Sequence, residues 1–301
     1  MALSRTPLRY PGGKQRLSPF LIEILKTNNL LDCDYVEPYA GGAGAALELL
    51  LTRKVRKIHL NDSSLPVYSF WKAVLNYTDE FCRLISSASL TIDEWRRQKD
   101  IIKNPADHDE LTLGFSTFYL NRVNRSGVIS GGIIGGINQD GNWKMDARFS
   151  RFDLIQRIES IAYRQRDIAV TNMDAEVFIK KYLPKTPERT LVYFDPPYFE
   201  KSEGLYLNDY IKKDHERLAL TIQNNVNHKW ILSYDGHEKI LSYYKQRKFF
   251  IYDLQYNAQR IYKGKEVFIF CDDLRIPSRS SLPYINIELN KLNNAEAENV
   301  S

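Results

Sequence analysis

The motif "DPPY" at residues 195–198 directly follows the apolar run "TLVYF". Asp195 can accept a hydrogen bond from an amine, and the ring of Tyr198 offers a flat face on which a base can stack. Pro196 and Pro197 fix the backbone and lack N–H groups, so nearby carbonyl oxygens can face outward as acceptors. Acceptors beside an aromatic face suit a pocket for an exocyclic amine. The alternative is a simple turn that ends a strand.

A second motif, "EPYAGGAGA" at residues 37–45, places Glu37 and a glycine cluster that includes Gly41 between an apolar run and a helical pattern. Glycine lets the backbone turn tightly and approach a ligand, and the following helix offers free N–H groups. Asp62 ends the next apolar run, about 20 residues after the cluster, where an acid can bind ribose hydroxyls in a nucleotide-binding fold. The alternatives are a tight strand–helix connection and, for Asp62, a helix N-cap.

Two further observations bear on what this second motif could bind. Its glycines are spaced G-G-x-G, and the absence of the G-x-G-x-x-G spacing disfavours a nicotinamide dehydrogenase. Asp174 ends the stretch "VTNMD" and could accept a hydrogen bond from an adenine amine. The alternative role for Asp174 is a cap for the helical pattern "AEVFIKKY" that follows it.

These residues need a scaffold, and the order of the apolar runs predicts it. Helical patterns lie between several of the runs, which predicts an α/β fold with a largely parallel sheet and helices on both faces. The seven predicted strands are residues 33–39, 57–62, 167–174, 190–195, 229–235, 249–254 and 266–272. Ligands bind at the carboxyl ends of the strands in such a sheet, so the two motifs should lie side by side there.

The second and third predicted strands are about a hundred residues apart, whereas a βαβ crossover needs roughly a dozen. We therefore predict an inserted, mostly helical domain at residues 65–165. Within it, Thr91 and Glu94 form a capping-box pattern at the start of one helix. A segment with six glycines between residues 127 and 141 is predicted to form a mobile loop or hairpin. The alternative is an elaborate crossover with no separate function.

The predicted insertion is rich in basic side chains. They include Arg96, Arg97, Lys99, Arg122, Arg125, Arg148 and Arg151. Charge runs on helices are usually solvated faces, and the formal net charge of +5 is compatible with a polyanionic partner without requiring one. Beside a glycine-rich segment, basic residues are candidates for contact with phosphate groups.

Composition sets the remaining limits. Cys33, Cys82 and Cys271 lie far apart without a CxxC or CxxH pattern, so neither a disulfide framework nor a metal site is expected. The first residues lack the apolar segment of a signal peptide, and no apolar run approaches the roughly 18 residues of a membrane span. These features favour a reduced, cytoplasmic setting with no membrane partner.

Five motifs, in their order along the chain, resemble those of the Dam-type adenine-specific DNA methyltransferases. They are "PLRYPGGK" (7–14), "EPYAGGAGA" (37–45), "ND" (61–62), "NMD" (172–174) and "DPPY" (195–198). The resemblance implies a Rossmann-like methyltransferase core with a mostly parallel seven-stranded sheet. It implies that this core comprises residues 1–64 and 166–289, and that residues 65–165 are an inserted target-recognition domain. The polar tail, 290–301, is expected to be frayed.

The stretch "FYLNRVNRSG" at residues 118–127 is similar to the start of the family's recognition segment. It departs from the family pattern soon after "LNR", so no recognition sequence can be carried over. Within and near this segment, the candidates for contact with DNA are Arg122, Arg125 and Arg148.

The resemblance implies that S-adenosylmethionine donates a methyl group to the exocyclic amine of a flipped adenine in double-stranded DNA. Asp195 and the carbonyl of Pro196 would hold the amine, and Tyr198 would stack on the base. The motif residues taken as catalytic are Asp195, Pro196, Pro197 and Tyr198. The residues assigned to the cofactor side of the pocket are Tyr10, Lys14, Glu37, Gly41, Asp62, Asp174 and Asp195. The alternative for Lys14 is a solvated side chain beside a glycine turn.

Three alternative functions stay open at this point. The same pocket could act on the amine of cytosine in DNA or of adenine in RNA. The chain could also be a catalytically silent DNA-binding homologue, although the intact motif at residues 195–198 argues against this. The sequence does not decide the oligomeric state or the biological setting, whether restriction–modification, phage or housekeeping methylation.

Overall fold

The computed structural model describes residues 5–9, 14–199, 212–258, 260–277 and 287–288. Within these ranges a single sheet has the strand order β3-β2-β1-β4-β5-β7-β6-β8. The strands are β1 (Cys33–Glu37), β2 (Val55–Asn61), β3 (Ile168–Thr171), β4 (Thr190–Phe194), β5 (Lys229–Asp235), β6 (Lys248–Ala258), β7 (Arg260–Phe270) and β8 (Ile287–Glu288). All seven predicted strands are therefore present, and the two-residue β8 extends the sheet beside β6.

Strand direction confirms the predicted fold class. The neighbours from β3 through β2, β1 and β4 to β5 are all parallel, and β7 is antiparallel to β5. The order 3-2-1-4-5 places β1 and β4 at the centre, as in a doubly wound Rossmann-like sheet. A hairpin of β6 and β7 completes the sheet on the β5 side. The carboxyl ends of the five parallel strands consequently share one edge.

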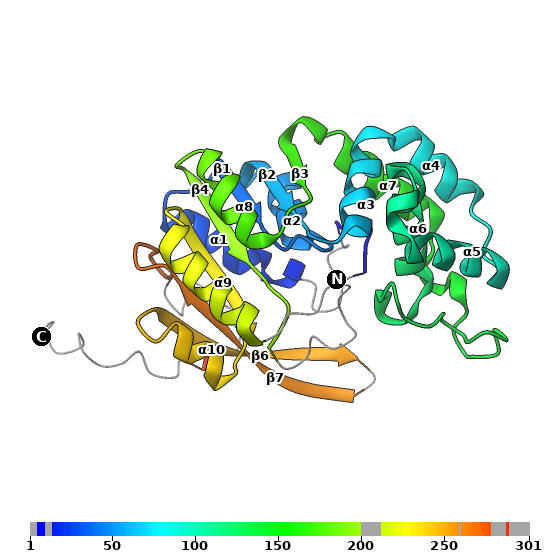
Figure 1. Ribbon diagram of the computed structural model, residues 1–301. Helices are drawn as coiled ribbons and strands as arrows, with labels where there is room; N and C mark the ends of the chain where they lie inside the picture. The colour runs from blue at the N-terminus through cyan, green and yellow to red at the C-terminus, as the bar shows by residue number, and fades with distance from the viewer. Residues whose placement is uncertain (1–4, 10–13, 200–211, 259, 278–286, 289–301) are drawn as a thin grey trace, which may run out of the picture.

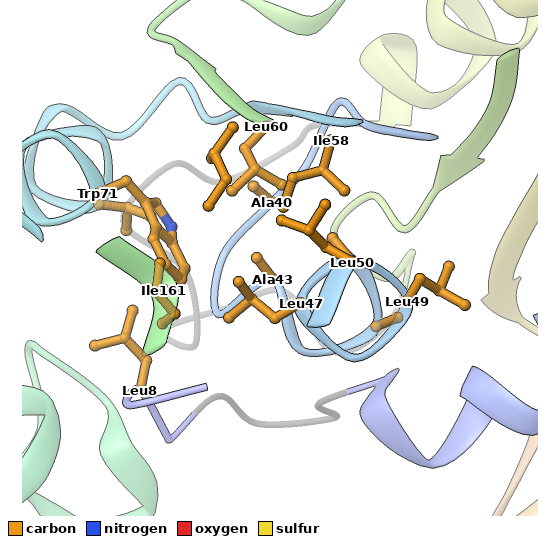
Figure 2. Close-up of a cluster of buried hydrophobic side chains, with 14 of the residues drawn as sticks. Leu8, Ala40, Ala43, Leu47, Leu49, Leu50, Ile58, Leu60, Trp71 and Ile161 are labelled. Carbon is orange, nitrogen blue, oxygen red and sulfur yellow. The ribbon is translucent and has the colours of Figure 1, made fainter. Parts of the chain in front are cut away.

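Helices cover both faces because alternate residues of each buried strand point to opposite sides. Tyr35 of β1 belongs to a buried apolar cluster with α1 and α2, whereas its neighbour Val36 belongs to a second cluster with α8, α9 and α10. Figure 1 shows α9 and α10 lying along the sheet, and Figure 2 shows Leu50 of α2 beside Ile58 of β2. The helices are α1 (Ser18–Thr27), α2 (Gly44–Leu51), α8 (Ala175–Lys181), α9 (Lys212–Asn225) and α10 (Glu238–Tyr243).

Between β2 and β3 the chain forms a group of helices at one side of the sheet (Figure 1). They are α3 (Leu65–Asn76), α4 (Thr78–Ser87), α5 (Ile92–Lys103), α6 (Glu110–Val123) and α7 (Arg151–Ala162). Thr91 caps α5 by accepting a hydrogen bond from the backbone N–H of Glu94 at 3.2 Å, as the capping pattern predicts. None of the described helices is long and apolar enough to cross a membrane.

Short 3₁₀ turns connect these elements. They are η1 (Lys14–Leu17), η2 (Pro105–Asp107), η3 (Arg125–Gly127), η4 (Met145–Arg148), η5 (Gln165–Asp167) and η6 (Leu183–Lys185). The start of the predicted glycine-rich segment folds back on itself, because Asn124 and Ile133 form an antiparallel bridge. One isolated bridge closes this part of the segment, and the described residues between α6 and α7 contain no paired strands.

The helical group is built around phenylalanine rings. Phe118 of α6 is fully buried and packs against Phe70, Phe81 and Phe149, with ring centroids 5.4–6.2 Å apart. These rings belong to the same buried cluster as Trp71 and the side chains of α2. The apolar core of the helical group is thus continuous with that of one sheet face.

Truncating a ring in this shared core should destabilise the whole fold. We expect Phe118→Ala to lower the free energy of unfolding by about 3–5 kcal/mol, since it removes apolar contacts and leaves a cavity. Phe152→Ala is the matched control because Phe152 of α7 is 72% exposed, and its effect should lie within about 0.5 kcal/mol. Urea denaturation of both variants measures the difference. Equal losses would contradict the proposed location of the core.

Candidate active site

Four acids gather at the carboxyl edge of the parallel strands. Glu37 ends β1, Asp62 follows β2, Asp195 follows β4, and Asp235 ends β5. Because β1, β2, β4 and β5 are parallel and adjacent in the sheet, these positions lie along one edge. The strand order therefore brings "DPPY" beside the glycine motif, as the sequence predicts.

Asp195 is held by groups from two other elements. Its Oδ1 accepts a hydrogen bond from Ser233 Oγ of β5 at 2.7 Å and lies 3.3 Å from Lys14 Nζ. Burial raises the pKa of Asp195, while the Lys14 ammonium and the Ser233 hydroxyl act in the opposite direction. Ser233 Oγ is also 2.8 Å from Tyr193 OH, so the hydroxyl that fixes Asp195 is itself fixed. These contacts fix the orientation of the Asp195 carboxyl group at the carboxyl edge of the sheet.

Tyr198 is fixed through its hydroxyl group. Lys14 Nζ donates to Tyr198 OH at 2.6 Å, and Tyr198 OH donates in turn to Glu266. Lys14 Nζ is also 3.3 Å from a carboxylate oxygen of Glu266. Lys14 is only 8% exposed, which excludes the alternative of a solvated lysine. One ammonium group therefore links Asp195, Tyr198 and Glu266.

Glu266 is a site residue that sequence reasoning missed. It belongs to β7, which runs antiparallel to β5, and it pairs with Asp235 in the register. Glu266, which precedes the apolar part of β7, therefore lies at the edge where the parallel strands end. The acid before "VFIF" is visible in the sequence, but only the direction of the strand assigns it to this edge.

The backbone that follows "DPPY" is also anchored. The N–H of Phe199 donates to Asp235 Oδ1 at 3.0 Å. The Phe199 ring lies against the rings of His215 and His237, with centroids 5.1 and 4.5 Å away. These contacts hold both ends of the motif, since Asp195 is fixed at the other end.

The glycine motif forms a tight turn above the edge of the sheet. Gly41 has a positive φ of 44°, and its N–H donates to Asp62 Oδ2 at 2.9 Å. Trp71 of α3 donates its indole N–H to the Gly41 carbonyl at 3.0 Å. Asp62 Oδ1 accepts from the N–H of Ser64 at 2.9 Å in the turn before α3. The N-cap of α3 is Ser64, so the N-cap alternative for Asp62 is wrong. Burial raises the pKa of Asp62 to about 6.

Glu37 lies beneath this turn. Its Oε1 accepts hydrogen bonds from the N–H of Ala46 and the hydroxyl of Tyr35, both at 3.1 Å. Burial raises the pKa of Glu37 to about 8, and the nearby charge of Asp195 adds to the effect. A buried carboxyl with a raised pKa is a group that a neighbouring positive charge would stabilise in its ionised form.

Asp174 lies at the start of α8. Its Oδ1 accepts from the N–H groups of Glu176 and Val177 at 3.0 and 3.2 Å, which is the helix cap given above as the alternative. A contact with a ligand stays a prediction for this exposed residue. Tyr10 and the tail at 290–301 lie outside the described residues.

The three arginines assigned to DNA occupy different environments. Arg125 and Arg148 are exposed, whereas Arg122 is buried. The Arg122 guanidinium donates to the carbonyls of Arg148, at 2.7 Å, and Pro7, at 3.3 Å. Burial lowers the pKa of Arg122, with further lowering from Arg9 and Arg157. Arg122 therefore binds protein backbone, and its burial argues against the direct contact with DNA expected from its charge.

A separate cavity of about 500 Å³ opens at the opposite, amino-terminal edge of the sheet. Its lining includes Asp34, Arg56, His59 and Tyr182. Within it the His59 ring bridges Asp34 Oδ2 and Tyr182 OH, with both distances 2.9 Å. These polar groups satisfy one another, and the cavity is distinct from the edge that carries "DPPY".

The acids at the carboxyl edge provide acceptors for amines and hydroxyls. Among the described residues, no group of three or more His, Cys, Asp or Glu side chains is arranged to hold a metal ion. Glu37, Asp62 and Asp195 surround a glycine turn, and this set suits a ligand with hydroxyl groups and positive charge. The motif beside it suits a planar partner that carries an amine.

Comparison with known proteins gives a family match. The family model of the D12 class N6 adenine-specific DNA methyltransferases matches residues 10–259. A search of curated proteins finds no match. Similar solved structures include the rRNA methyltransferase aviRa from Streptomyces viridochromogenes, with 12% identity, 87% of this chain and 86% of that chain covered, and a TM-score of 0.35. An rRNA methylase from Streptococcus thermophilus has 12% identity, coverage of 84% and 96%, and a TM-score of 0.33.

The environment of Glu37 predicts a specific pH dependence of stability. Its pKa is about 8 when folded, above the roughly 4.3 of an unfolded chain. Between these values only the folded state keeps Glu37 protonated. The stability that this proton contributes therefore falls as the pH rises through this range and is lost by about pH 8. In this window the wild type should lose at most about 1.4 kcal/mol of unfolding free energy per pH unit through Glu37. Glu37→Gln should not show this loss, because glutamine does not titrate.

Urea denaturation near pH 5.5 and pH 8.5 measures the effect. The free energy of unfolding of Glu37→Gln, relative to wild type, should increase toward the higher pH. Glu188→Gln, at an exposed position, is the control and should follow wild type at both values. The same pH dependence in Glu37→Gln and wild type would argue against a protonated Glu37.

Proposed function

Because the chain belongs to the D12 class of N6 adenine-specific DNA methyltransferases, we propose that it methylates the exocyclic amine of adenine in double-stranded DNA. The methyl donor in this proposal is S-adenosylmethionine. The observation that carries the proposal is the placement of Asp195 and Tyr198 in one hydrogen-bonded network beside the glycine turn. That network presents an acceptor and a ring to the same space.

The residues around the glycine turn fit the proposed cofactor. The Asp62 carboxylate would accept hydrogen bonds from ribose hydroxyls, exchanging its contact with the Gly41 N–H for a ligand contact or sharing it. Glu37 and Gly41 would face the charged methionine part, where a positive charge would favour ionised Glu37. Asp174 would accept a hydrogen bond from the amine of the cofactor's adenine. When bound, the cofactor supplies a methyl group activated by its positively charged sulfur.

The work of the protein is then to present the amine. An adenine amine is a poor nucleophile because its lone pair is delocalised into the ring. Hydrogen bonds from the amine to Asp195 and to the Pro196 carbonyl would hold the nitrogen in a more tetrahedral form and expose the lone pair. This is positioning and electrostatic stabilisation, and Asp195 is not required to remove a proton before attack.

Tyr198 would stack on the target base after the base leaves the duplex. The hydroxyl of Tyr198 is bound by Lys14 and Glu266, which restricts rotation of its ring. A ring that is fixed in advance loses less conformational entropy when the base binds. Lys14 thus supports both halves of the motif, because it also contacts Asp195.

We further propose that residues 65–165 recognise the DNA while residues 1–64 and 166–289 carry the chemistry. Arg125 and Arg148 lie on the insertion and are exposed. Trp143, in the segment between them, is 72% exposed, and an exposed aromatic ring flanked by basic residues suits contact with nucleic acid. Phosphate contacts supply affinity, and contacts with base edges supply sequence preference.

The first test replaces the acceptor for the amine. We expect Asp195→Asn to lower the rate of methyl transfer by roughly 100-fold or more, as for loss of a preorganised polar group, and to leave cofactor affinity nearly unchanged. Radiolabelled cofactor with nucleoside analysis measures the rate and identifies the product, and calorimetry measures cofactor affinity. Asp107→Asn, at an exposed residue of η2, is the control.

Near-normal turnover of Asp195→Asn would refute its assigned role. Label found as methylated cytosine, or only in RNA, would instead identify one of the alternative substrates. Cofactor binding without transfer to any nucleic acid would favour the silent homologue.

The second test distinguishes arginines that contact phosphate groups from those that contact base edges. Arg125→Ala and Arg148→Ala should weaken binding to all DNA and reduce the slope of log affinity against log salt by about 1, if each contacts a phosphate. If either reads a base edge, it should relax site preference instead. Arg122→Ala should mainly lower the free energy of unfolding, since this side chain binds buried carbonyls. Arg83→Ala, at an exposed side chain of α4, controls for the loss of one positive charge.

Measurements of binding at several salt concentrations, together with profiles of the methylated sites, distinguish these outcomes. Unchanged binding and site choice in both exposed variants would exclude these arginines from the DNA interface.

A further inference from the structure

The segment before Lys14 packs against the insertion as well as the sheet. Leu8 lies in the buried cluster that contains Trp71 of α3 and Ile161 of α7, and Figure 2 shows Leu8 beside Ile161. Arg157 Nη1 donates to the Thr6 carbonyl at 2.9 Å. Together with Arg122, which donates to the Pro7 carbonyl, these contacts bind successive residues of the segment to α6 and α7.

Arg9 is the last described residue of this segment, and Asn121 of α6 binds both of its backbone groups. The Arg9 N–H donates to Asn121 Oδ1 at 2.7 Å, and Asn121 Nδ2 donates to the Arg9 carbonyl at 2.7 Å. Asn121 is 1% exposed, so water cannot replace these bonds if the side chain is lost. One amide side chain therefore fixes the position of Arg9 against the end of α6.

The turn after α6 closes on Arg9 from a second direction. Asn121 Nδ2 also donates to the Gly127 carbonyl at 2.8 Å. Gly127 has a φ of +78°, and a Cβ at this position would overlap the Arg9 carbonyl oxygen. Only glycine allows both the conformation and the approach. Arg9 is thus held between Asn121 and Gly127, and its Nη1 donates to the Asn124 carbonyl at 3.0 Å. The exposed Arg125 follows Asn124 in the chain.

Arg9 and Lys14 are five residues apart in the chain. Lys14 contacts Asp195 and Tyr198, so a short covalent path joins the Arg9 contacts to the proposed catalytic motif. We propose that Asn121 and Gly127 are positioning residues that couple the DNA-binding insertion to the placement of Lys14. This inference rests on the proposed function and assigns "LNR" a coupling role in place of the DNA contact that its resemblance suggested.

Coupling of this kind gives the insertion a way to influence the chemistry. DNA bound at Arg125 would act on the turn that contains Gly127, and that turn touches Arg9 directly. In this proposal a displacement of Arg9 alters the position of Lys14 and weakens its contacts with Asp195 and Tyr198. Small errors in the placement of reacting groups reduce rates strongly, by roughly 100-fold for about 1 Å.

The test compares Gly127→Ala with Gly132→Ala. Gly132 lies in the same glycine-rich segment, but a Cβ there meets no atom within 4 Å. We expect Gly127→Ala to slow single-turnover methyl transfer by roughly 10- to 100-fold while the dissociation constant for DNA changes less than about threefold. Gly132→Ala should match wild type in both. Asn121→Asp, which keeps the acceptor and removes the donors, should act like Gly127→Ala and replaces it if that variant does not fold.

A double-mutant cycle with Lys14→Met distinguishes positioning from general damage. If Gly127 acts through Lys14, Gly127→Ala should add little to the loss of rate already caused by Lys14→Met. Additive losses, or equal behaviour of Gly127→Ala and Gly132→Ala, would overturn the inference. An absence of methyl transfer to DNA by wild type and Gly132→Ala alike would overturn the proposed function instead.

Hydrogen exchange provides a readout that does not need activity. Without DNA, Gly127→Ala should increase amide exchange in η1, which begins at Lys14, and at residues 198–199, whereas Gly132→Ala should not. Unchanged exchange at both places in Gly127→Ala would overturn the structural link, whatever the substrate proves to be.

Discussion

The site depends on a single buried ammonium group. Lys14 is 8% exposed and contacts Asp195 and Tyr198 of one motif and Glu266 of β7, so the network joins three separate parts of the chain. Burial of a lone ammonium would cost several kcal/mol, and two carboxylates with a phenol oxygen offset that cost only when they converge. The same convergence holds Tyr198 and Asp195 in place. Removal of Lys14 would leave two acids near each other without compensation, so the network acts as one unit.

The sheet topology makes this convergence possible. Parallel strands bring Glu37, Asp62 and Asp195 to one edge, and the reversed β7 adds Glu266 to that edge from the other direction. An all-parallel sheet would have placed the start of β7 at the opposite edge. The hairpin of β6 and β7 is therefore more than an edge cover, because its direction completes the charge balance around Lys14.

Sequence reasoning predicted the parts that depend on local pattern. The apolar runs gave all seven strands, Thr91 gave a true helix cap, and "DPPY" and the glycine motif do lie at the same edge. It missed Glu266 and Ser233, because strand direction and side-chain facing arise from tertiary structure. It also took Arg122 for a surface charge, although its guanidinium binds two buried carbonyls. Charge in a sequence does not distinguish an arginine that binds backbone from one that meets solvent.

The continuity of the apolar core has a consequence for how this architecture can diversify. Trp71 of α3 lies within the insertion and in the shared buried cluster, and its indole N–H donates to the Gly41 carbonyl. An exchange of α3–α7 between related chains would therefore disturb the glycine turn unless Trp71 is retained. A junction at the end of β2 would replace Trp71, whereas a junction after α3 would have to preserve the packing of Phe70 against Phe118 of α6. Exposed positions such as Trp143 and Arg148 can accordingly change with less effect on the shared core than the helices as a whole.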